Sequence, residues 1–335
     1  MQWTLSIPNT WVGYAVLPER RIANIFQPLG SQAASEYRIA LLALGITGII
    51  FVVVAGLIVF TLIRFRRRRA DPSHEEPPQV YGSNQIEIAW TFIPILTVFV
   101  LIGVTARFIL AIQDAALPRA TEHVRIVGHR WWWEVHYPDY GVTTANEIHV
   151  PVSIGNESPV LLQLESADVI HSFWVPQLSG KTDLIPGLAN TMWIDAHQPG
   201  IYSGNCAEYC GTQHANMLLR VFAEPKKDFD KWIAAQRLSA NAGAASDRDR
   251  AVFESLSCVN CHNVQGTAAH GVFGPDLTHL MQRTTIAAGM IPNNADNLRK
   301  WVADPQTLKP GCLMPGMKLT SPQLDSVVSY LKSLD

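Results

Sequence analysis

Two cysteines, a histidine and a methionine stand close together in the segment GNCAEYCGTQHANM, residues 204–217. Cys206, Cys210, His214 and Met217 offer two thiolates, an imidazole and a thioether, which are ligand types that copper and zinc take in proteins. The segment is too rich in Gly, Asn and other polar residues to form a core helix. This combination predicts a metal-binding loop.

The number of sulfur ligands bears on which metal the loop would hold. A mononuclear blue-copper centre uses one thiolate, two imidazoles and a weak axial thioether, so one of the two cysteines would be surplus. Both thiolates could instead bridge two copper ions, each of which would also take one imidazole. The second imidazole would then come from His171, which lies upstream in the segment DVIHSFWVPQL.

Two alternatives remain open from the residues alone. A tetrahedral zinc ion could be held by Cys206, Cys210, His214 and His171, but this site would leave Met217 without a role. A disulfide between Cys206 and Cys210 would leave both histidines without a role.

A second motif is less ambiguous. Cys258, Cys261 and His262 form CxxCH, in which two thiols add to the vinyl groups of a haem and the histidine reaches the iron. A thioredoxin-like dithiol would need a preceding strand, and a structural zinc site would need a second CxxC. The motif therefore predicts a covalently bound c-type haem.

The haem iron needs a second axial ligand, and a methionine thioether keeps its potential high. The segment KPGCLMPGMKL, residues 309–319, offers Met314 and Met317. It resembles the ligand loop of small cytochromes c, in which proline follows the axial methionine, and this resemblance implies Met314, with Met317 as the reserve. The segment FGPDLTHL resembles the haem-edge loop of those cytochromes, which implies that Pro275 packs against His262.

Two apolar segments precede these motifs. Residues 39–63 form an uncharged run, and residues 86–112 form a second run that is interrupted only by Glu87, Pro94 and Arg107. As a helix that rises ~1.5 Å per residue, each run exceeds the ~30 Å hydrocarbon core of a bilayer. Neighbouring helices tolerate the kink that a proline causes. The two runs therefore predict a transmembrane hairpin.

The loop between the two runs, residues 64–85, begins with RFRRRR and so carries five arginines. Arginines concentrated in a short loop mark the cytoplasmic side of a membrane. We therefore expect the N-terminal segment, residues 1–38, and everything after residue 113 to lie outside the cytoplasm. Residues 1–38 do not resemble a signal peptide, because prolines and charges break the apolar pattern.

The exported part begins with a predicted β domain, residues 114–225. Short β-type runs with turn residues between them predict a sandwich or barrel. The runs are HVRIVGHRWWWEVHY, EIHVPV, VLLQLES, TMWIDA, GIYSG and MLLRVFAE. Alternation along the first run would put Trp131 and Trp133 on one strand face.

The rest of the chain is predicted to be helical. Residues 226–248 contain an amphipathic helix, DFDKWIAAQRL, and a linker of small residues, SANAGAAS. In residues 249–335, Ser321 and Pro322 predict a helix start, and apolar residues then recur at helical spacing. The fold class is thus a multidomain membrane protein with a two-helix transmembrane hairpin, a β-barrel or sandwich and an all-α domain.

Composition supports this organisation. The 335-residue chain is 48% hydrophobic and 16% charged, which favours a membrane-associated protein. Its formal net charge of -2 excludes a generally basic nucleic-acid binder. Its five cysteines are too few and too clustered for a disulfide framework, and Cys312, outside both motifs, has no expected role.

The segments DVIHSFWVPQL, KTDLIPG and CAEYCGTQHANM occur in that order behind the predicted hairpin. Over residues 37 to about 236 the chain resembles cytochrome c oxidase subunit II, and its C-terminal part resembles the cytochrome c domain fused to this subunit in some bacterial terminal oxidases. The resemblance implies a cupredoxin-like domain with a binuclear CuA centre, followed by a class I cytochrome c domain with haem c.

The same resemblance implies a ligand set for the copper pair. Cys206 and Cys210 would bridge the two ions, with His171 and Met217 completing one ion and His214 and the backbone carbonyl of Glu208 completing the other.

Three further positions match residues with roles in that family. Trp131 corresponds to the aromatic residue at which electrons enter the copper site, and the carboxylate of Glu208 to a ligand of a magnesium ion shared with subunit I. Glu87 corresponds to the acid at the mouth of a proton path into subunit I. From the residues alone, Trp131 would serve ordinary barrel packing, and Glu87 would be an interfacial acid favoured at a helix N-terminus.

The implied function is electron transfer within a haem-copper terminal oxidase of a bacterial inner membrane. A donor cytochrome c or cytochrome bc complex would reduce the haem, and electrons would continue through CuA to subunit I, where oxygen is reduced to water and protons are translocated. Subunit I, subunit III and membrane lipid are the expected partners, and nucleic acid is not.

Other classes share part of the pattern. A membrane-tethered copper chaperone or thiol oxidoreductase is the alternative, but it would be expected in a thioredoxin-like frame and would not need His214 and Met217 beside Cys210. A quinol oxidase subunit II would lack the copper ligands and the haem motif. A nitrous oxide reductase would lack the paired membrane anchor.

Overall fold

The computed structural model describes residues 19–20, 24–66, 79, 81–114, 122–153, 159–240 and 246–335. The chain divides into two compact units, one formed by Ala34–Ala115 and the other by Met1–Ala33 with Ala116–Asp335. Most of the predicted N-terminal segment, most of the arginine-rich loop and part of the predicted linker lie outside the described residues.

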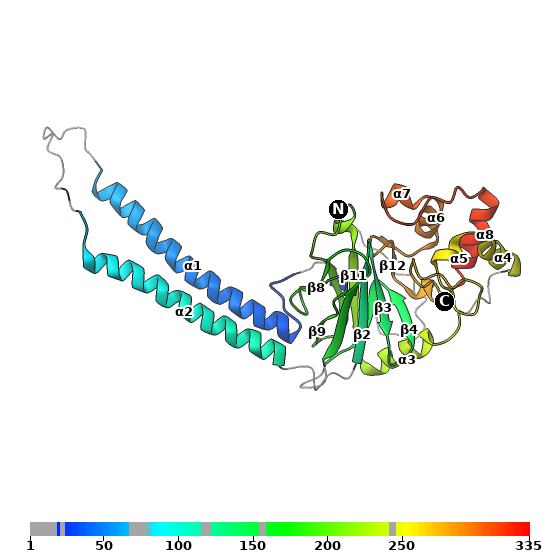
Figure 1. The fold of residues 1–335 in the computed structure, drawn as a ribbon, viewed down its shortest axis with the longest axis horizontal. Helices are drawn as coiled ribbons and strands as arrows, with labels where there is room; N and C mark the ends of the chain where they lie inside the picture. Colours follow the sequence, from blue (N-terminus) through cyan, green and yellow to red (C-terminus); the bar gives the residue numbers. More distant parts are fainter. Residues whose placement is uncertain are drawn as a thin grey trace. The chain divides into compact units, whose positions relative to one another are not determined.

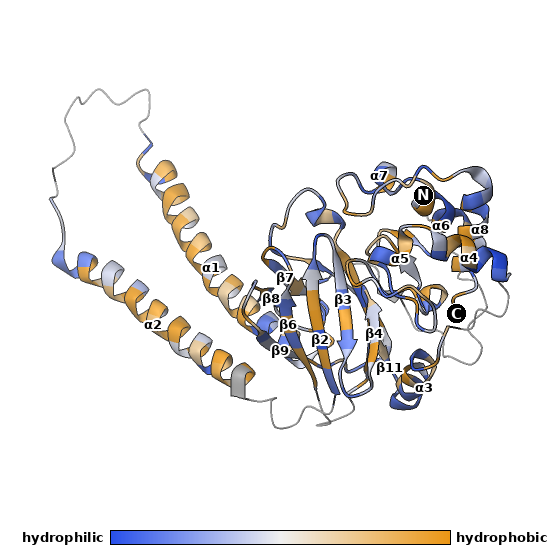
Figure 2. Ribbon diagram, turned by 45° about the vertical axis from the view of Figure 1, so that its right-hand side comes forward, coloured by the Kyte–Doolittle hydropathy of each residue, from blue (hydrophilic) through white to orange (hydrophobic). Residues whose placement is uncertain are grey.

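Two long helices provide nearly all of the first unit: α1, Ser31–Arg64, whose first residues up to Ala33 belong to the second unit, and α2, Asn84–Asp114. Both are long and apolar enough to cross a membrane, and Figure 2 shows them orange along most of their length. Large side chains such as Phe51 and Ile63 are more than two-thirds exposed, which suits a lipid environment better than water. Pro94 lies inside α2 without ending it, as the sequence predicts.

The start of α1 lies upstream of the apolar run that predicts it. The backbone N–H of Ser31 donates to Oδ1 of Asp195 at 2.7 Å, so a carboxylate from a distant segment caps the helix. A cap that comes from far away in the chain leaves no signal in the local sequence.

The β domain of the second unit contains two large sheets (Figure 1). In the first sheet the strand order is β5-β11-β10-β7-β8, with β1 paired to β10, and in the second it is β4-β3-β2-β6-β9. The strands are β1 Glu19–Arg20, β2 Glu122–His129, β3 Trp132–Tyr137, β4 Val142–Ala145, β5 Glu147–Pro151, β6 Val160–Ser166, β7 His171–Trp174, β8 Thr182–Leu184, β9 Asn190–Ile194, β10 Gly200–Cys206 and β11 Leu218–Glu224.

One hydrophobic core joins the two sheets. Ile126 and Leu162 come from the second sheet, Phe173 and Val221 come from the first, and all four are fully buried. Because side chains of a strand alternate between two faces, each sheet turns its apolar face to the other. The predicted β-sandwich is confirmed.

The first predicted run is not one strand. The strands β2 and β3 are antiparallel neighbours, with Gly128 opposite Trp133 and His129 opposite Trp132. Trp131 therefore lies in the turn between them, and the prediction that it shares a strand face with Trp133 is wrong. The chain reverses here, and Asp168 receives a hydrogen bond of 2.7 Å from the backbone N–H of Arg130 in the turn.

Besides the two-residue strand β1, three strands of the β domain escaped the sequence patterns. The strands β4, β7 and β8 are only three or four residues long, too short for alternation to be visible. The helix α3, Lys226–Gln236, is at the predicted place, but its Phe229, Trp232 and Ile233 are buried in the sandwich core. It therefore belongs to the β domain and is not part of a free tether.

The C-terminal residues form a helical domain with its own core, which includes Phe253, Leu298 and Val327. Its elements are α4 Asp247–Ser255, α5 Cys258–Cys261, η2 Leu280–Gln282, β12 Thr285–Ile286, β13 Ile291–Pro292, α6 Ala295–Ala303, α7 Pro305–Leu308 and α8 Ser321–Leu331. The helix α8 begins where the sequence predicts, although Thr320 and not Ser321 is the capping residue. The short ribbon β12–β13 was not expected.

Candidate copper and haem centres

The strands of the first sheet bring the predicted copper ligands together. Cys206 ends β10 and Met217 directly precedes β11, the antiparallel neighbour of β10. The loop between them contains Cys210 and the one-turn helix η1, His214–Asn216. His171 begins β7, which pairs with β10 so that Cys206 lies opposite Phe173. Segments that are distant in sequence therefore share one corner of the sheet.

The ligand atoms of this corner lie at distances that metal ions could bridge. Sγ of Cys206 is 3.8 Å from Sγ of Cys210 and 3.9 Å from Nδ1 of His171. Sγ of Cys210 is 3.6 Å from Nδ1 of His214 and 3.9 Å from Sδ of Met217. Ligands held ~2.3 Å from a tetrahedral ion lie about 3.7 Å apart, so the residues present fit a soft metal.

The same distances bear on the two alternatives to a copper site, a disulfide between the cysteines and a zinc ion. Cys206 and Cys210 are both free, and their sulfurs are much farther apart than the ~2.05 Å of a disulfide. His171, Cys206 and Cys210 form a cluster in which all ligand atoms lie within 4.8 Å of one another. The thioether of Met217 lies in the same group and is fully buried, which a four-ligand zinc site would not use.

The electrostatics of the loop favour a thiolate at Cys206. The hydrogen bond from Cys210 holds the pKa of Cys206 well below its usual range, while the same pairing, with burial, raises the pKa of Cys210. A bound cation would deprotonate both of them, because a coordinating thiol loses its proton outright.

The backbone carbonyl and the carboxylate of Glu208 lie in different surroundings. Its backbone carbonyl lies 3.2 Å from Sγ of Cys206, inside the ligand cluster. Its side chain is exposed, as is that of Tyr209 next to it. The carbonyl thus lies among the predicted copper ligands, and the carboxylate lies outside the cluster.

Asp168 contacts a predicted copper ligand, and the sequence analysis did not single it out. Its Oδ1 lies 2.8 Å from Nε2 of His171, and this contact leaves Nδ1 of the imidazole turned towards Cys206. Carboxylates that hold the second nitrogen of a ligand histidine fix its tautomer and orientation. Burial opposes ionisation of Asp168, but hydrogen bonds from His171, Val169 and Arg130 outweigh it and lower its pKa to about 2. The spacing Asp-x-x-His in DVIH was the available signal.

Trp131 lies against the loop of residues 207–217 between β10 and β11, which carries predicted copper ligands and is called the copper loop below. Its Nε1–H donates to the carbonyl oxygen of Cys210 at 3.0 Å, and the residue is 9% exposed. A Cβ at Gly211 would stand 3.0 Å from the indole ring, and the φ of +118° at this position also favours glycine. The ring is therefore in direct contact with the backbone that carries one of the predicted bridging thiolates.

The haem motif occupies α5 and the residue after it. Nδ1 of His262 lies 2.7 Å from the carbonyl oxygen of Pro275, as expected of a proximal histidine, which leaves Nε2 for the iron. A Cβ at Gly274 would lie 2.6 Å from Cε1 of His262, so only glycine allows this approach. Burial lowers the pKa of His262, which favours the neutral imidazole that binds iron.

The segment of residues 309–319, called the methionine loop below, contains Met314 and Met317. It is held by Gln306, another residue that the sequence did not single out. Its Nε2 donates to the carbonyl oxygens of Met314 at 2.7 Å and Cys312 at 2.9 Å, and its Oε1 accepts from the backbone of Gly311 at 2.9 Å. Met314 and Met317 are both half-buried, so burial does not distinguish between the two predicted ligands.

The haem domain and the β domain share a polar junction. The carboxylate of Glu147 on β5, only 2% exposed, accepts hydrogen bonds from the backbone of Thr284 at 3.0 Å and of Thr285 at 2.9 Å. The backbone N–H of Leu218, next to Met217, donates to the carbonyl of Ala288 at 3.1 Å. The haem domain is therefore in contact with the end of the copper loop.

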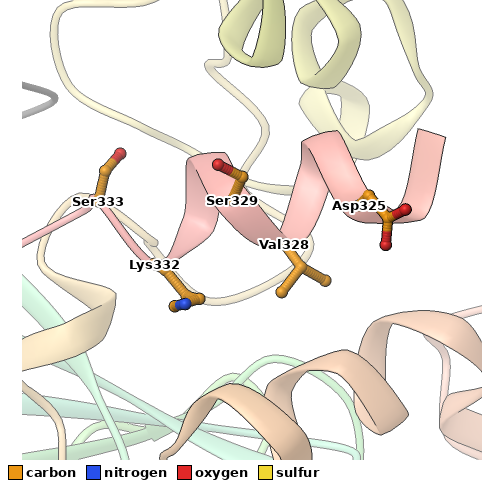
Figure 3. Close-up of a pocket in the computed structure, with 5 residues that line it drawn as sticks. All are labelled: Asp325, Val328, Ser329, Lys332 and Ser333. Atoms are coloured by element: carbon orange, nitrogen blue, oxygen red, sulfur yellow. The ribbon is translucent and has the colours of Figure 1, made fainter. Parts of the chain in front are cut away.

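Glu87 and a hollow along α8 give less information about function. Glu87 lies in the first turn of α2 and is exposed, which agrees with both of its expected roles. A shallow hollow along α8 is lined by Asp325, Val328, Ser329, Lys332 and Ser333, as Figure 3 shows. None of these five residues is a predicted ligand.

Three protein families match the sequence in consecutive regions. The transmembrane domain of cytochrome c oxidase subunit II matches residues 25–112, its periplasmic domain matches residues 141–223, and cytochrome c matches residues 247–335. These regions include the two long helices, the copper loop and the CxxCH motif in turn.

Curated relatives match over most of their length. Cytochrome c oxidase subunit 2 of Alkalihalophilus pseudofirmus is 34% identical over 314 residues, which cover 92% of this chain and 89% of the relative. The protein of the same name from Bacillus sp. (strain PS3) is 35% identical over 329 residues, with 92% and 90% coverage. Quinol oxidase subunit 2 of Bacillus subtilis is 30% identical, but over only 63% of this chain and 65% of the relative.

Proposed function

Because this chain belongs to the family of cytochrome c oxidase subunit II, a component of haem-copper terminal oxidases, we propose that it relays electrons from a c-type haem to a CuA centre and on to subunit I. The observation that carries the proposal is the group of three sulfur and two imidazole ligand atoms at one corner of the first sheet, each 3.6–3.9 Å from a neighbour. The CxxCH domain in contact with this corner supports the order of transfer.

When bound, the haem and the copper pair supply one-electron carriers whose redox change makes and breaks no covalent bond. Cys258 and Cys261 would hold the haem covalently, with His262 and Met314 as axial ligands to its iron. Cys206 and Cys210 would bridge the coppers; His171 and Met217 would complete one, and His214 with the carbonyl of Glu208 the other.

The protein's own contribution is a stiff and dry ligand cage. His171 and Met217 are fully buried, and Cys206 and Cys210 are 2% and 5% exposed, so water is excluded from most of the site. Cys206 and Met217 are fixed by the backbone of β10 and β11, and His171 is also held by Asp168. Ligands that cannot move favour electron relay, because little rearrangement accompanies a change of charge.

The remaining roles concern the partners. We propose that the two helices pack against subunit I, that subunit III belongs to the same complex, and that the donor is a cytochrome c or a cytochrome bc complex. Oxygen reduction and proton translocation would take place in subunit I. Glu87 would lie at the mouth of a proton path, the exposed carboxylate of Glu208 would reach a shared magnesium ion, and electrons would enter the copper site at Trp131.

We further propose that the N-terminus and both redox domains lie outside the cytoplasm, at the inner membrane of a bacterium. The arginine-rich loop between the helices supports this orientation, since such loops remain on the cytoplasmic side.

Metal analysis of the purified complex, with the copper that a haem-copper oxidase holds in subunit I subtracted, tests the proposal. We expect a copper-to-chain ratio of two, a near-infrared band with a seven-line copper EPR pattern, and a c-type haem spectrum. Cys206→Ser should remove the copper signals and keep the haem, while Cys312→Ser, outside both motifs, should keep both. Zinc, or one copper ion per chain, would contradict the proposal, and a labile copper ion or a Cys206–Cys210 disulfide would favour a chaperone or thiol oxidoreductase.

A further inference from the structure

Lys309 has an environment that packing alone does not explain. The residue is only 3% exposed, and its Nζ donates to the backbone carbonyl oxygens of Trp131 at 2.9 Å, Asn216 at 2.8 Å and Ala287 at 3.2 Å. Lysine is almost never fully buried unless it is paired, and here the partners are neutral carbonyls. Burial lowers the pKa of Lys309 to about 8, so the site holds this ammonium at a cost.

The three carbonyls belong to three different segments. Trp131 lies in the turn between β2 and β3 and touches Cys210 through its indole N–H. Asn216 directly precedes the predicted copper ligand Met217. Ala287 belongs to the connection between β12 and β13 in the haem domain. A single ammonium, with three donors, therefore ties the copper loop and the Trp131 turn to the haem domain.

Lys309 itself belongs to the loop that carries the predicted axial methionine. Its neighbour Pro310 accepts a hydrogen bond of 2.7 Å from Nε2 of Gln213, a buried residue of the copper loop. On its other side the loop is held by Gln306, which bonds the carbonyl of Met314. The methionine loop is thus held at one end by its own domain and at the other by the copper loop.

We propose that Lys309 is a positioning residue for haem-to-copper electron transfer: it fixes the methionine loop against Trp131 and the copper loop. The proposal rests on the proposed function. In the step concerned, the ferrous haem iron loses one electron and the copper pair gains it, with no proton transferred. Electron tunnelling falls steeply with distance, so a displacement of either loop slows this step.

The alternative is that Lys309 only helps to hold the two domains together. The contacts of Glu147 with Thr284 and Thr285 form a second connection between the domains, and none of these three residues belongs to the copper or methionine loop. Amide exchange at Thr284 and Thr285 therefore reports docking through contacts that Lys309 does not itself make. Docking and positioning can be measured separately.

The experiment compares three forms of the purified oxidase complex: the natural chain, Lys309→Met and Lys332→Met. Methionine keeps the length of the side chain but removes its donors, and Lys332 is an exposed lysine of the same domain (Figure 3). Flash photoreduction of the haem gives the rate of haem-to-copper transfer. Haem and copper spectra report the two centres, and hydrogen exchange reports the loops and the docking contacts.

For Lys309→Met we expect transfer slowed severalfold, faster amide exchange in residues 309–317 and 213–217, and unchanged exchange at Thr284 and Thr285. In Lys309→Met, both spectra and the rate of haem reduction by an external donor should stay as in the natural chain. Lys332→Met should match the natural chain in every measurement. If Lys309→Met does not assemble, Lys309→Gln, which keeps donors at shorter reach, is expected to slow transfer in the same way.

Three results would overturn the proposal. One is a transfer rate within about twofold of the natural chain. The second is a slower rate that comes with lost protection at Thr284 and Thr285, which would make Lys309 a docking residue only. The third is loss of either spectrum, which would make it a structural support of that centre. Failure of the proposed function is distinct, because the natural chain and Lys332→Met would then also lack CuA signals or haem-to-copper transfer.

Discussion

At the scale of single residues, the group of predicted copper ligands is bordered by residues that are not themselves predicted to bind metal. Asp168 sets which nitrogen of His171 faces Cys206, and Gly211 leaves room for the ring of Trp131. These residues control the direction and the spacing of ligands. Replacing them should alter the centre while every predicted ligand remains.

Asp168→Asn tests this at the copper site. The carboxylate accepts from both His171 and the backbone of Arg130, and an amide cannot satisfy both donors with the same geometry. We expect copper affinity to fall by about ten- to hundredfold, with altered hyperfine splitting in the copper EPR spectrum. Competition with a chelator measures the affinity. Asp139→Asn, an exposed acid of the same domain, is the control, and equal affinity in both variants would exclude a role for Asp168.

At the scale of elements, the predicted ligands lie in or next to short loops, and the neighbouring strands and helices hold these loops in place. The copper loop is fixed because β10 and β11 are antiparallel neighbours on either side of it. The proximal histidine follows the four-residue helix α5 and is held by a loop, residues 273–277, that contributes Gly274 and the carbonyl of Pro275. Loops placed by a rigid scaffold are where binding residues gather.

Gly274→Ala tests whether the loop of residues 273–277 holds the predicted haem ligand His262 in place. The added Cβ would stand 2.6 Å from Cε1 of His262 and 2.9 Å from its Nδ1, so the imidazole must turn away from the iron or the loop must move. We expect less covalently bound haem and loss of the low-spin haem spectrum. Gly316→Ala, whose Cβ would meet only Asp304 at 3.6 Å, should retain both. A normal haem spectrum in Gly274→Ala would show that this close contact is dispensable.

At the scale of the whole molecule, the haem domain is better described as docked on the β domain than as a tethered shuttle. The sequence predicts a helix and a linker in residues 226–248, and in the structure the helix of this segment, α3, packs in the sandwich core. Buried polar contacts of Glu147 then join the domains, and Trp132, Ala145 and Ala288 form a small apolar cluster across the junction. Such contacts make the arrangement specific as well as close.

Glu147→Ala tests the docking. The change leaves the backbone donors of Thr284 and Thr285 without their buried acceptor, at a cost of about 1–3 kcal/mol. We expect amide exchange at these two threonines to accelerate by about tenfold or more, with haem and copper spectra unchanged. Asp325→Asn on the exposed face of α8 should leave the exchange unaltered. Unchanged protection in Glu147→Ala would mean that other contacts alone hold the junction.

The sequence by itself determined the parts of this protein. Apolar runs, short β-type segments and CxxCH are local patterns, so they predicted the two helices, the sandwich and the haem domain, and the motif residues identified the family. The sequence could also nominate His171 as a partner of the copper loop, because the ligand chemistry required a second imidazole.

Only the tertiary structure decided what surrounds those parts. The turn at Trp131, the contact of Asp168 with His171, and the docking through Glu147 and Lys309 each depend on pairs of groups that are close in space but not marked by local periodicity. A buried lysine or glutamate in a sequence looks the same as a solvated one. Its burial and its partners become fixed only when the two domains pack, because desolvation is a property of the folded arrangement.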